Sequence, residues 1–257
     1  MASSKRKTVG LALSGGVALG GAHIGVLKAL REHDVTIDYI SGTSVGALVG
    51  SLYAFNQDID EVERVAKALS WRDISTFSVS TFALFSNRKM KNLLKKHIGD
   101  AQFQDAKIPL SIIATDISSG SKVVIEKGSV ADAVLASTCI PGIFKPIQLN
   151  GGLLVDGGIV ENLPISPLRS KGADIIIAVD LNAKRGIQKP TNIMDVLINS
   201  FHFTLSNASR KMHDEADILV APNLAEFNLI KTDQTPQLIE VGYKEANRVL
   251  SELTKLF

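Results

Sequence analysis

The chain has 257 residues and a formal net charge of +2, from 28 lysine and arginine residues against 26 aspartate and glutamate residues. Hydrophobic residues make up 45% and charged residues 21%, close to the average of globular domains, which excludes a disordered, a fibrous and a disulfide-rich chain. The near-neutral balance argues against a dedicated nucleic-acid binder, which would carry a strongly basic face. Because the single cysteine, Cys139, cannot form an internal disulfide, we expect a reducing compartment, the cytoplasm.

Short apolar strands alternate with helices from the first element onward. A buried strand is predicted over residues 9–13, and the small-residue loop after it leads into a helix over residues 22–33. A second strand, over residues 37–41, runs into a glycine-rich turn and an apolar helix that extends through Phe55. Helices are then expected over residues 58–69, 90–98, 129–137, 194–215 and 236–256, and strands over residues 108–115, 122–126, 173–179 and 218–221.

This alternation predicts an α/β fold, a three-layer α/β/α sandwich with a mostly parallel central sheet. No linker, repeat or low-complexity tract divides the sequence, so we expect a flexible N-terminus over residues 1–7 and one domain over residues 8–257. Two uncharged stretches, residues 8–27 and 39–57, are long enough to span a bilayer. Glycines interrupt both, and we therefore interpret them as buried strand–turn–helix units.

The strongest chemical signal is Gly42-Thr43-Ser44-Val45-Gly46, a G-x-S-x-G motif between a predicted strand and a predicted helix. This is the context of a nucleophile elbow, in which a serine is exposed on a tight turn and the flanking glycines allow close backbone approach. The N-terminus of the following helix would face the site where an oxyanion develops. The structural alternative is a glycine-rich turn with a capping serine.

Two further glycine-rich segments would complete such a site. Residues 14–21, again between a strand and a helix, leave backbone N–H groups free to face a phosphate or an oxyanion, although their spacing fits neither a dinucleotide fingerprint nor a P-loop. Val155-Asp156-Gly157-Gly158 places an aspartate on a tight turn after a short strand, which in most proteins is only a turn. Together the three segments supply a nucleophile, an oxyanion hole and a base.

With these segments in this order, the chain resembles the patatin-like phospholipase family, in particular its bacterial single-domain members. The resemblance rests on a glycine-rich block, a nucleophile block, a proline block and a block with the catalytic aspartate. They lie at residues 11–27, 38–54, 136–142 and 156–164. Four blocks in the family's order cover most of residues 8–180 and are far more specific than any one motif.

The resemblance implies a patatin-like acyl hydrolase domain in which a Ser–Asp dyad cleaves phospholipids, lysophospholipids or related acyl esters, as in lipid degradation. Ser44 would attack the ester carbonyl, and Asp156 would accept its proton and later activate water. Burial in an apolar pocket can raise the pKa of a carboxyl group enough for this role. The backbone amides of Gly15, Gly16 and Val17 would form the oxyanion hole. No metal or cofactor is implied, because no cluster of His, Cys and carboxylate residues has ligand spacing.

The glycine-rich block departs from the family pattern G-G-G-x-R/K-G at two positions. Val17 stands where the family has glycine, and Leu19 replaces the basic residue. A valine can donate its N–H, but it tolerates a positive φ poorly. If the loop requires that conformation, the oxyanion hole is distorted, and losing one oxyanion donor costs about 100- to 1,000-fold in rate.

Histidine-based catalysis is the main alternative to the dyad. An elbow serine followed by Asp180 and a histidine would satisfy the Ser–Asp–His order of α/β-hydrolases. The candidate histidines, His202 and His213, both fall within the long predicted helix instead of on a loop. We therefore expect packing or surface roles for all five histidines, and a buried structural thiol at Cys139.

The segment over residues 77–97 is a candidate for contact with a membrane. Three phenylalanines within nine residues precede a basic helix, a combination that suits insertion at an anionic interface. The residues concerned are Phe77, Phe82, Phe85, Lys89, Lys91, Lys95 and Lys96. The alternative is a loop packed on the core, followed by a solvated helix. The sequence thus predicts a cytoplasmic protein with a peripheral membrane contact as one option.

Three other functions compete with a phospholipid hydrolase. A carboxylesterase for short soluble esters would share the site and differ in its chain-length profile. The substitutions at Val17 and Leu19 also fit a weakly active patatin-like protein that binds a lipid or a protein partner. A nucleotide binder would use the glycine-rich loop over residues 14–21.

Overall fold

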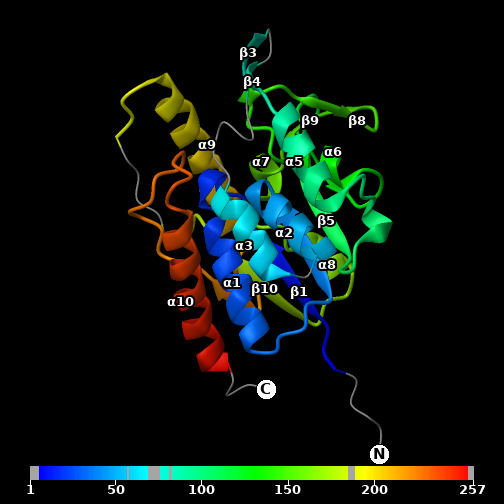
Figure 1. Cartoon of the computed structure of the whole chain (residues 1–257), viewed down its shortest axis with the longest axis vertical. Coiled ribbons are helices and arrows are strands. Elements are labelled where there is room, and N and C mark those ends of the chain that lie inside the picture. Colours follow the sequence, from blue (N-terminus) through cyan, green and yellow to red (C-terminus); the bar gives the residue numbers. More distant parts are fainter. Residues whose placement is uncertain (1–5, 57, 69–75, 81–82, 185–188, 254–257) are drawn as a thin grey trace, which may run out of the picture.

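The computed structural model describes residues 6–56, 58–68, 76–80, 83–184 and 189–253. Helices cover a central sheet on both faces (Figure 1). Helices α1 (Gly21–Glu32), α2 (Val45–Asn56), α3 (Ile59–Ala68) and α10 (Thr235–Leu253) lie together on one face. The predicted α/β/α arrangement is confirmed.

Eight strands of the described chain form this sheet in the order β11-β10-β1-β2-β5-β9-β8, with β6 paired to β5. Their bounds are β1 Val9–Leu13, β2 Tyr39–Thr43, β5 Leu110–Asp116, β6 Ser121–Ile125, β8 Ile147–Leu149, β9 Gly152–Asp156, β10 Ile175–Val179 and β11 Ile218–Val220. The strands from β11 to β5 in this order are parallel to one another, whereas β6, β8 and β9 pair antiparallel. The mostly parallel sheet expected from the sequence therefore carries an antiparallel extension beside β5.

Alternate residues of the central strands enter two separate cores. Leu11 and Leu13 of β1 join the larger core, under α1, α2, α3 and α10. Ala12 joins a smaller core on the opposite face with Leu163 and Leu168. Because both faces are buried, β1 and β10 carry no polar side chain. The remaining described helices are α5 Arg88–Ile98, α6 Val130–Ser137, α7 Gly158–Glu161, α8 Ser166–Ser170 and α9 Ile193–Arg210, with short 3-10 helices η1 Val17–Leu19, η2 Phe103–Asp105 and η3 His213–Glu215.

The carboxyl ends of the parallel strands gather the chemically distinctive segments at one edge of the sheet. β1 leads into the glycine-rich loop at Ser14, β2 leads into Ser44, and β10 leads into Asp180. Since β1 lies between β10 and β2 and is parallel to both, the three segments are neighbours. In open α/β sheets, this edge is where ligands bind.

Strand β5 brings the second candidate residue to the same place through its register. The first half of β5 pairs with β2, and the last pair places Ile113 opposite Thr43. The second half pairs with β9 and places Ala114 opposite Asp156. Ile113 and Ala114 are consecutive residues. One strand therefore places the residue after Thr43 beside Asp156.

A small second sheet was not expected from the sequence. The hairpin of β3 (Thr76–Ser80) and β4 (Ala83–Ser86) pairs with β7 (Gly142–Phe144). In Figure 1 the hairpin stands out from the body of the molecule, at the same end as the start of α9. The polar–apolar alternation of residues 76–80 is the strand signal that the prediction overlooked.

The long helix near the C-terminus is shorter than predicted. It ends at Arg210 instead of continuing to residue 215, and His213 lies in η3 with its side chain bonded to Asp180. Periodicity does not encode such a tertiary contact. None of the described helices is both long and apolar enough to cross a membrane.

Candidate active site

Ser44 lies on the tight turn between β2 and α2. Its φ is +54°, a left-handed conformation that non-glycine residues rarely adopt. The turn has no room for a side chain at Gly46, because a Cβ there would lie 2.1 Å from the carbonyl oxygen of Leu13. The Ser44 N–H donates to Oγ of Ser137 at 2.8 Å, and that hydroxyl donates to the carbonyl of Ile113 at 2.6 Å. Strand β5 thus holds the strained turn through a single serine.

Asp156 ends β9 with its side chain completely buried. Oδ1 accepts a hydrogen bond from the N–H of Gly158 at 2.8 Å, whereas Oδ2 has no well-formed hydrogen bond from the described residues. Burial raises the pKa of this carboxyl group from 3.8 to about 7, and the nearby Ser44 hydroxyl and the Gly158 N–H offset only part of that rise. A carboxyl group with a pKa near neutrality and an open oxygen is suited to accept a proton from a neighbouring hydroxyl.

Two backbone N–H groups of the glycine-rich loop are available to a ligand. The Gly15 N–H is engaged, because it donates to the backbone and side-chain oxygens of Asn162, at 3.3 and 3.1 Å. The N–H groups of Gly16 and Val17 have no acceptor within the described part of the chain. Of the three amides expected to form an oxyanion hole, two therefore remain free to do so.

Val17 adopts the conformation that a valine tolerates poorly. Its φ is +53°, and a left-handed residue with a Cβ is strained by about 1–2 kcal/mol. The loop keeps this shape despite the missing glycine. Valine at position 17 therefore lowers the stability of the folded protein, but it does not collapse the loop.

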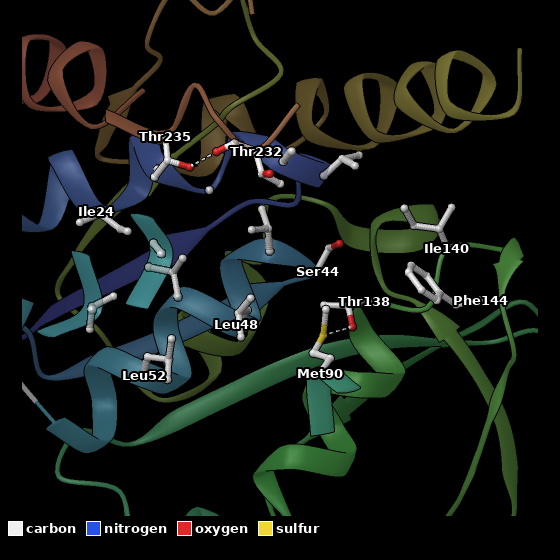
Figure 2. Close-up of a pocket in the computed structure, with 18 residues that line it drawn as sticks. Ile24, Ser44, Leu48, Leu52, Met90, Thr138, Ile140, Phe144, Thr232 and Thr235 are labelled. Atoms are coloured by element: carbon white, nitrogen blue, oxygen red, sulfur yellow. Dashed lines mark hydrogen bonds between the residues drawn. The ribbon is translucent and has the colours of Figure 1, made fainter. Parts of the chain in front are cut away.

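An apolar pocket of about 910 Å³, part of it open to solvent, extends from Ser44 along α2. Figure 2 shows the Ser44 hydroxyl between Leu48 and Leu52 on one side and Ile140 and Phe144 on the other. From Val45, the first residue of α2, to Leu52 the helix advances seven residues, which corresponds to about 10 Å. Farther walls come from α1, α3 and α5, through residues that include Ile24, Val62, Ala66 and Met90. The pocket has the shape and polarity to hold a hydrocarbon chain with its polar end at Ser44.

Of the alternative Ser–Asp–His triad, the aspartate and a histidine pair with each other, but the histidine does not line the pocket at Ser44. His213 Nε2 lies 2.7 Å from Oδ2 of Asp180, and this hydrogen bond raises the pKa of His213. None of the described histidines lines the Ser44 pocket.

Two other buried titratable groups fit packing roles. Burial lowers the pKa of His23 to about 4 and raises the pKa of the Cys139 thiol. Among the described residues, no group of three or more His, Cys, Asp and Glu side chains is placed to hold a metal ion.

The segment considered for membrane contact is only partly described. Phe77 lies in β3, Phe82 lies outside the described residues, and Phe85 is half-buried against another ring of the core. Lys91 and Lys95 of α5 form ion pairs with acidic neighbours at 2.5 Å. Lys89 and Lys96 of the same helix are exposed. The membrane contact stays a prediction.

Three residues that hold the site were not expected from the sequence: Ser137 at the Ser44 N–H, Asn162 at the Gly15 N–H, and Asn182, whose Nδ2 donates to the Gly15 carbonyl at 2.7 Å. The first two lie within the blocks that carry the family resemblance, but a single sequence does not distinguish them from their neighbours. Asn182 follows a buried strand by three residues, and a polar residue at the carboxyl end of a parallel strand is a usable signal.

Several known proteins are similar to this chain. A family model described as patatin-like phospholipase matches residues 11–169. An uncharacterized NTE family protein of Mycobacterium tuberculosis is 38% identical over 182 residues, which cover 70% of this chain and 50% of that protein. Lysophospholipase NTE1 of Candida glabrata is 33% identical over 183 residues, 69% of this chain and 11% of that protein. The chain thus spans half the length or less of these relatives. The crystal structure of VipD from Legionella pneumophila has the same fold, with a TM-score of 0.67 at 16% identity over 97% of this chain and 68% of VipD.

The strain at Val17 predicts an unusual order of stabilities. Alanine normally makes a protein more stable than glycine does, by about 0.4–1 kcal/mol. At a φ of +53° we expect the reverse, with Val17→Gly more stable than Val17→Ala by about 1 kcal/mol. Chemical denaturation of both variants measures the difference. An alanine variant at least as stable as the glycine variant would show that residue 17 is not strained.

Proposed function

Since this chain belongs to the patatin-like phospholipase family, we propose that it is a serine acyl hydrolase that cleaves acyl esters of phospholipids or lysophospholipids with a Ser44–Asp156 dyad. The observation that carries the proposal is the buried Asp156 carboxyl group, with a pKa of about 7, beside a strained serine at the end of an apolar pocket. The name of the relative lysophospholipase NTE1 favours the same substrate class. The proposed catalytic domain is residues 8–257.

In the proposed reaction, Oγ of Ser44 attacks the carbonyl carbon of the ester while Oδ2 of Asp156 takes the hydroxyl proton. The tetrahedral intermediate then breaks its bond to the leaving alcohol, which receives that proton from Asp156. The acyl group remains on Ser44 as an ester. Asp156 next removes a proton from water, whose oxygen attacks the acyl-enzyme, and returning that proton to Ser44 releases the fatty acid. A base whose pKa lies near the working pH serves both halves of this cycle.

The N–H groups of Gly16 and Val17 are the proposed donors to the oxyanion. Each is free of an acceptor among the described residues, and Val17 lines the same pocket as Ser44. Gly15 has a different role in the proposal, since its N–H already donates to Asn162. It anchors the loop and does not contact the oxyanion.

The dyad predicts loss of hydrolysis in two variants that preserve side-chain volume. Ser44→Ala and Asp156→Asn are each expected to lower kcat more than about 1,000-fold on lysophosphatidylcholine and on p-nitrophenyl esters. Ser51→Ala, which alters a second buried serine, inside α2, is the matched control and is expected to keep the wild-type rate.

The outcomes of this assay separate the rival functions. Activity retained in Asp156→Asn would contradict the dyad. A wild-type rate confined to short soluble esters would favour a carboxylesterase. Lipid binding without turnover, unchanged in Ser44→Ala, would favour a lipid-binding protein.

The pocket predicts that Leu52 limits the length of the acyl chain. Leu52→Trp fills the space next to α2, so we expect the rate on long-chain esters to fall at least about tenfold relative to short-chain esters, because methylene contacts are lost. Leu52→Ala enlarges the pocket and is expected not to reduce the ratio of the long-chain rate to the short-chain rate. Rates on p-nitrophenyl esters of graded chain length measure it. An unchanged profile in Leu52→Trp would place the acyl chain elsewhere.

We also propose a peripheral membrane contact that includes α9. Four of the exposed large hydrophobic side chains lie on this helix: Ile193 is 77% exposed, Phe203 45%, and Val196 and Leu197 49% and 37%. The start of α9 stands at the same end of the molecule as the β3–β4 hairpin (Figure 1). An apolar helix face together with the basic helix α5 fits insertion at an anionic lipid surface.

This contact predicts weaker vesicle binding when α9 becomes polar. The double variant Ile193→Asp and Phe203→Asp is expected to bind phosphatidylcholine–phosphatidylglycerol vesicles at least about tenfold less in co-sedimentation, because burial of apolar surface drives such insertion. Hydrolysis of a soluble short ester should not change. Ile117→Asp with Val124→Asp alters exposed apolar residues elsewhere and serves as the control. Equal binding by wild type and the α9 variant would exclude this face.

A further inference from the structure

A series of buried polar side chains holds the glycine-rich loop from the side of β10. Asp180 follows the end of β10 and is completely buried. Because a carboxylate can only accept, His213 donates from Nε2 to Oδ2 of Asp180 at 2.7 Å. Asn182, 4% exposed, donates from Nδ2 to the carbonyl oxygen of Gly15 at 2.7 Å. The proposed transfer of protons between Ser44 and Asp156 uses none of these three side chains.

The carbonyl of Gly15 and the N–H of Gly16 are two ends of one peptide group. That group is planar and trans, so its C=O and N–H bonds point in opposite directions. Two donors fix the carbonyl end: Nδ2 of Asn182 at 2.7 Å and Oγ of Ser14 at 3.1 Å. Holding the carbonyl therefore sets the direction of the Gly16 N–H.

This peptide group needs an external restraint because glycine flanks it on both sides. Neither residue has a Cβ, so the φ and ψ angles that would turn the peptide over are poorly restricted. The chain itself therefore does not fix whether the N–H or the carbonyl of this group faces the reacting serine. The two donors at the Gly15 carbonyl restrain it, and the shorter of the two contacts is that of Asn182.

Asp180 in turn fixes which end of the Asn182 amide faces the loop. Nδ2 lies between two acceptors, the Gly15 carbonyl at 2.7 Å and Oδ1 of Asp180 at 3.4 Å. A turned amide would place its oxygen against both of these oxygens. The backbone N–H of Asn182 also donates to Oδ1 of Asp180, at 2.9 Å. His213 stabilises the buried charge on which this arrangement depends.

We propose that Asn182 is a positioning residue for the oxyanion hole, and that Asp180 and His213 orient its amide. The inference rests on the proposed hydrolase function. Asn182 does not contact substrate; it keeps the Gly16 N–H directed at the position where negative charge develops. Its loss lets the peptide turn, which weakens stabilisation of the intermediate. Binding of the acyl chain in the apolar pocket does not use this N–H.

The test is a comparison of kcat and KM for Asn182→Leu, which keeps the approximate size of the side chain and removes its donor. Rates are divided by the number of active sites titrated with a fluorophosphonate, so that unfolded protein does not contribute. We expect kcat on a p-nitrophenyl ester to fall about 10- to 100-fold, as for a weakened oxyanion donor, with KM unchanged within about twofold. Asn87→Leu alters another buried asparagine, at the start of α5, and is expected to keep both constants.

His213→Ala provides a second variant in case Asn182→Leu does not fold. His213 is partly exposed, so its loss perturbs the core less, and the same fall in kcat at constant KM is expected. A wild-type kcat per active site in the folded variants, or an equal loss in Asn87→Leu, would overturn the inference alone. If the wild-type protein hydrolysed esters no faster than Ser44→Ala does, the proposed function itself would be overturned.

Discussion

Strand β5 pairs along one edge with two strands in succession, first β2 and then β9. The candidate site depends on this change of partner. Ile113 lies opposite Thr43 at the end of β2, and the next residue, Ala114, lies opposite Asp156 at the end of β9. The parallel and antiparallel parts of the sheet therefore meet where the candidate nucleophile and base stand. Ser137 strengthens this junction, because its hydroxyl bonds both the Ser44 N–H and the Ile113 carbonyl. A shift of β9 by one residue would turn the Asp156 side chain to the other face of the sheet.

The fold tolerates a carboxyl group at this junction at the expense of stability. Burial raises the pKa of Asp156 from 3.8 to about 7, so between these values the folded protein holds a proton that the unfolded chain has released. The contribution of this group to stability is therefore greatest below about pH 4 and is lost as the pH rises through 7. The ionised form, which the proposed reaction requires, is the form that the fold accommodates least well. The left-handed Ser44 and Val17 add backbone strain at the same place.

Much of this arrangement was predictable from the sequence, because it is encoded in local patterns. The apolar runs of β1 and β10 and the glycines around Ser44 identified the strands, the elbow and the edge of the sheet where they meet. The register of β5 was not predictable, because it pairs residues separated by tens of positions. The contacts of Asn162 and Asn182 with Gly15 depend on side-chain directions that no periodicity specifies. The sequence did raise the question of Val17, but only its φ of +53° shows how the loop accommodates a valine.

In the proposed reaction Asp156 is a general base because burial moves its pKa to about 7. The most direct test is the pH dependence of kcat/KM on a soluble ester from about pH 4 to pH 9, which reports the ionisation of the free enzyme. We expect activity that rises about tenfold per pH unit below an inflection near pH 7 and stays level above it, since only the carboxylate accepts the Ser44 proton. An inflection near pH 4, where an ordinary aspartate ionises, or a profile without inflection would contradict it.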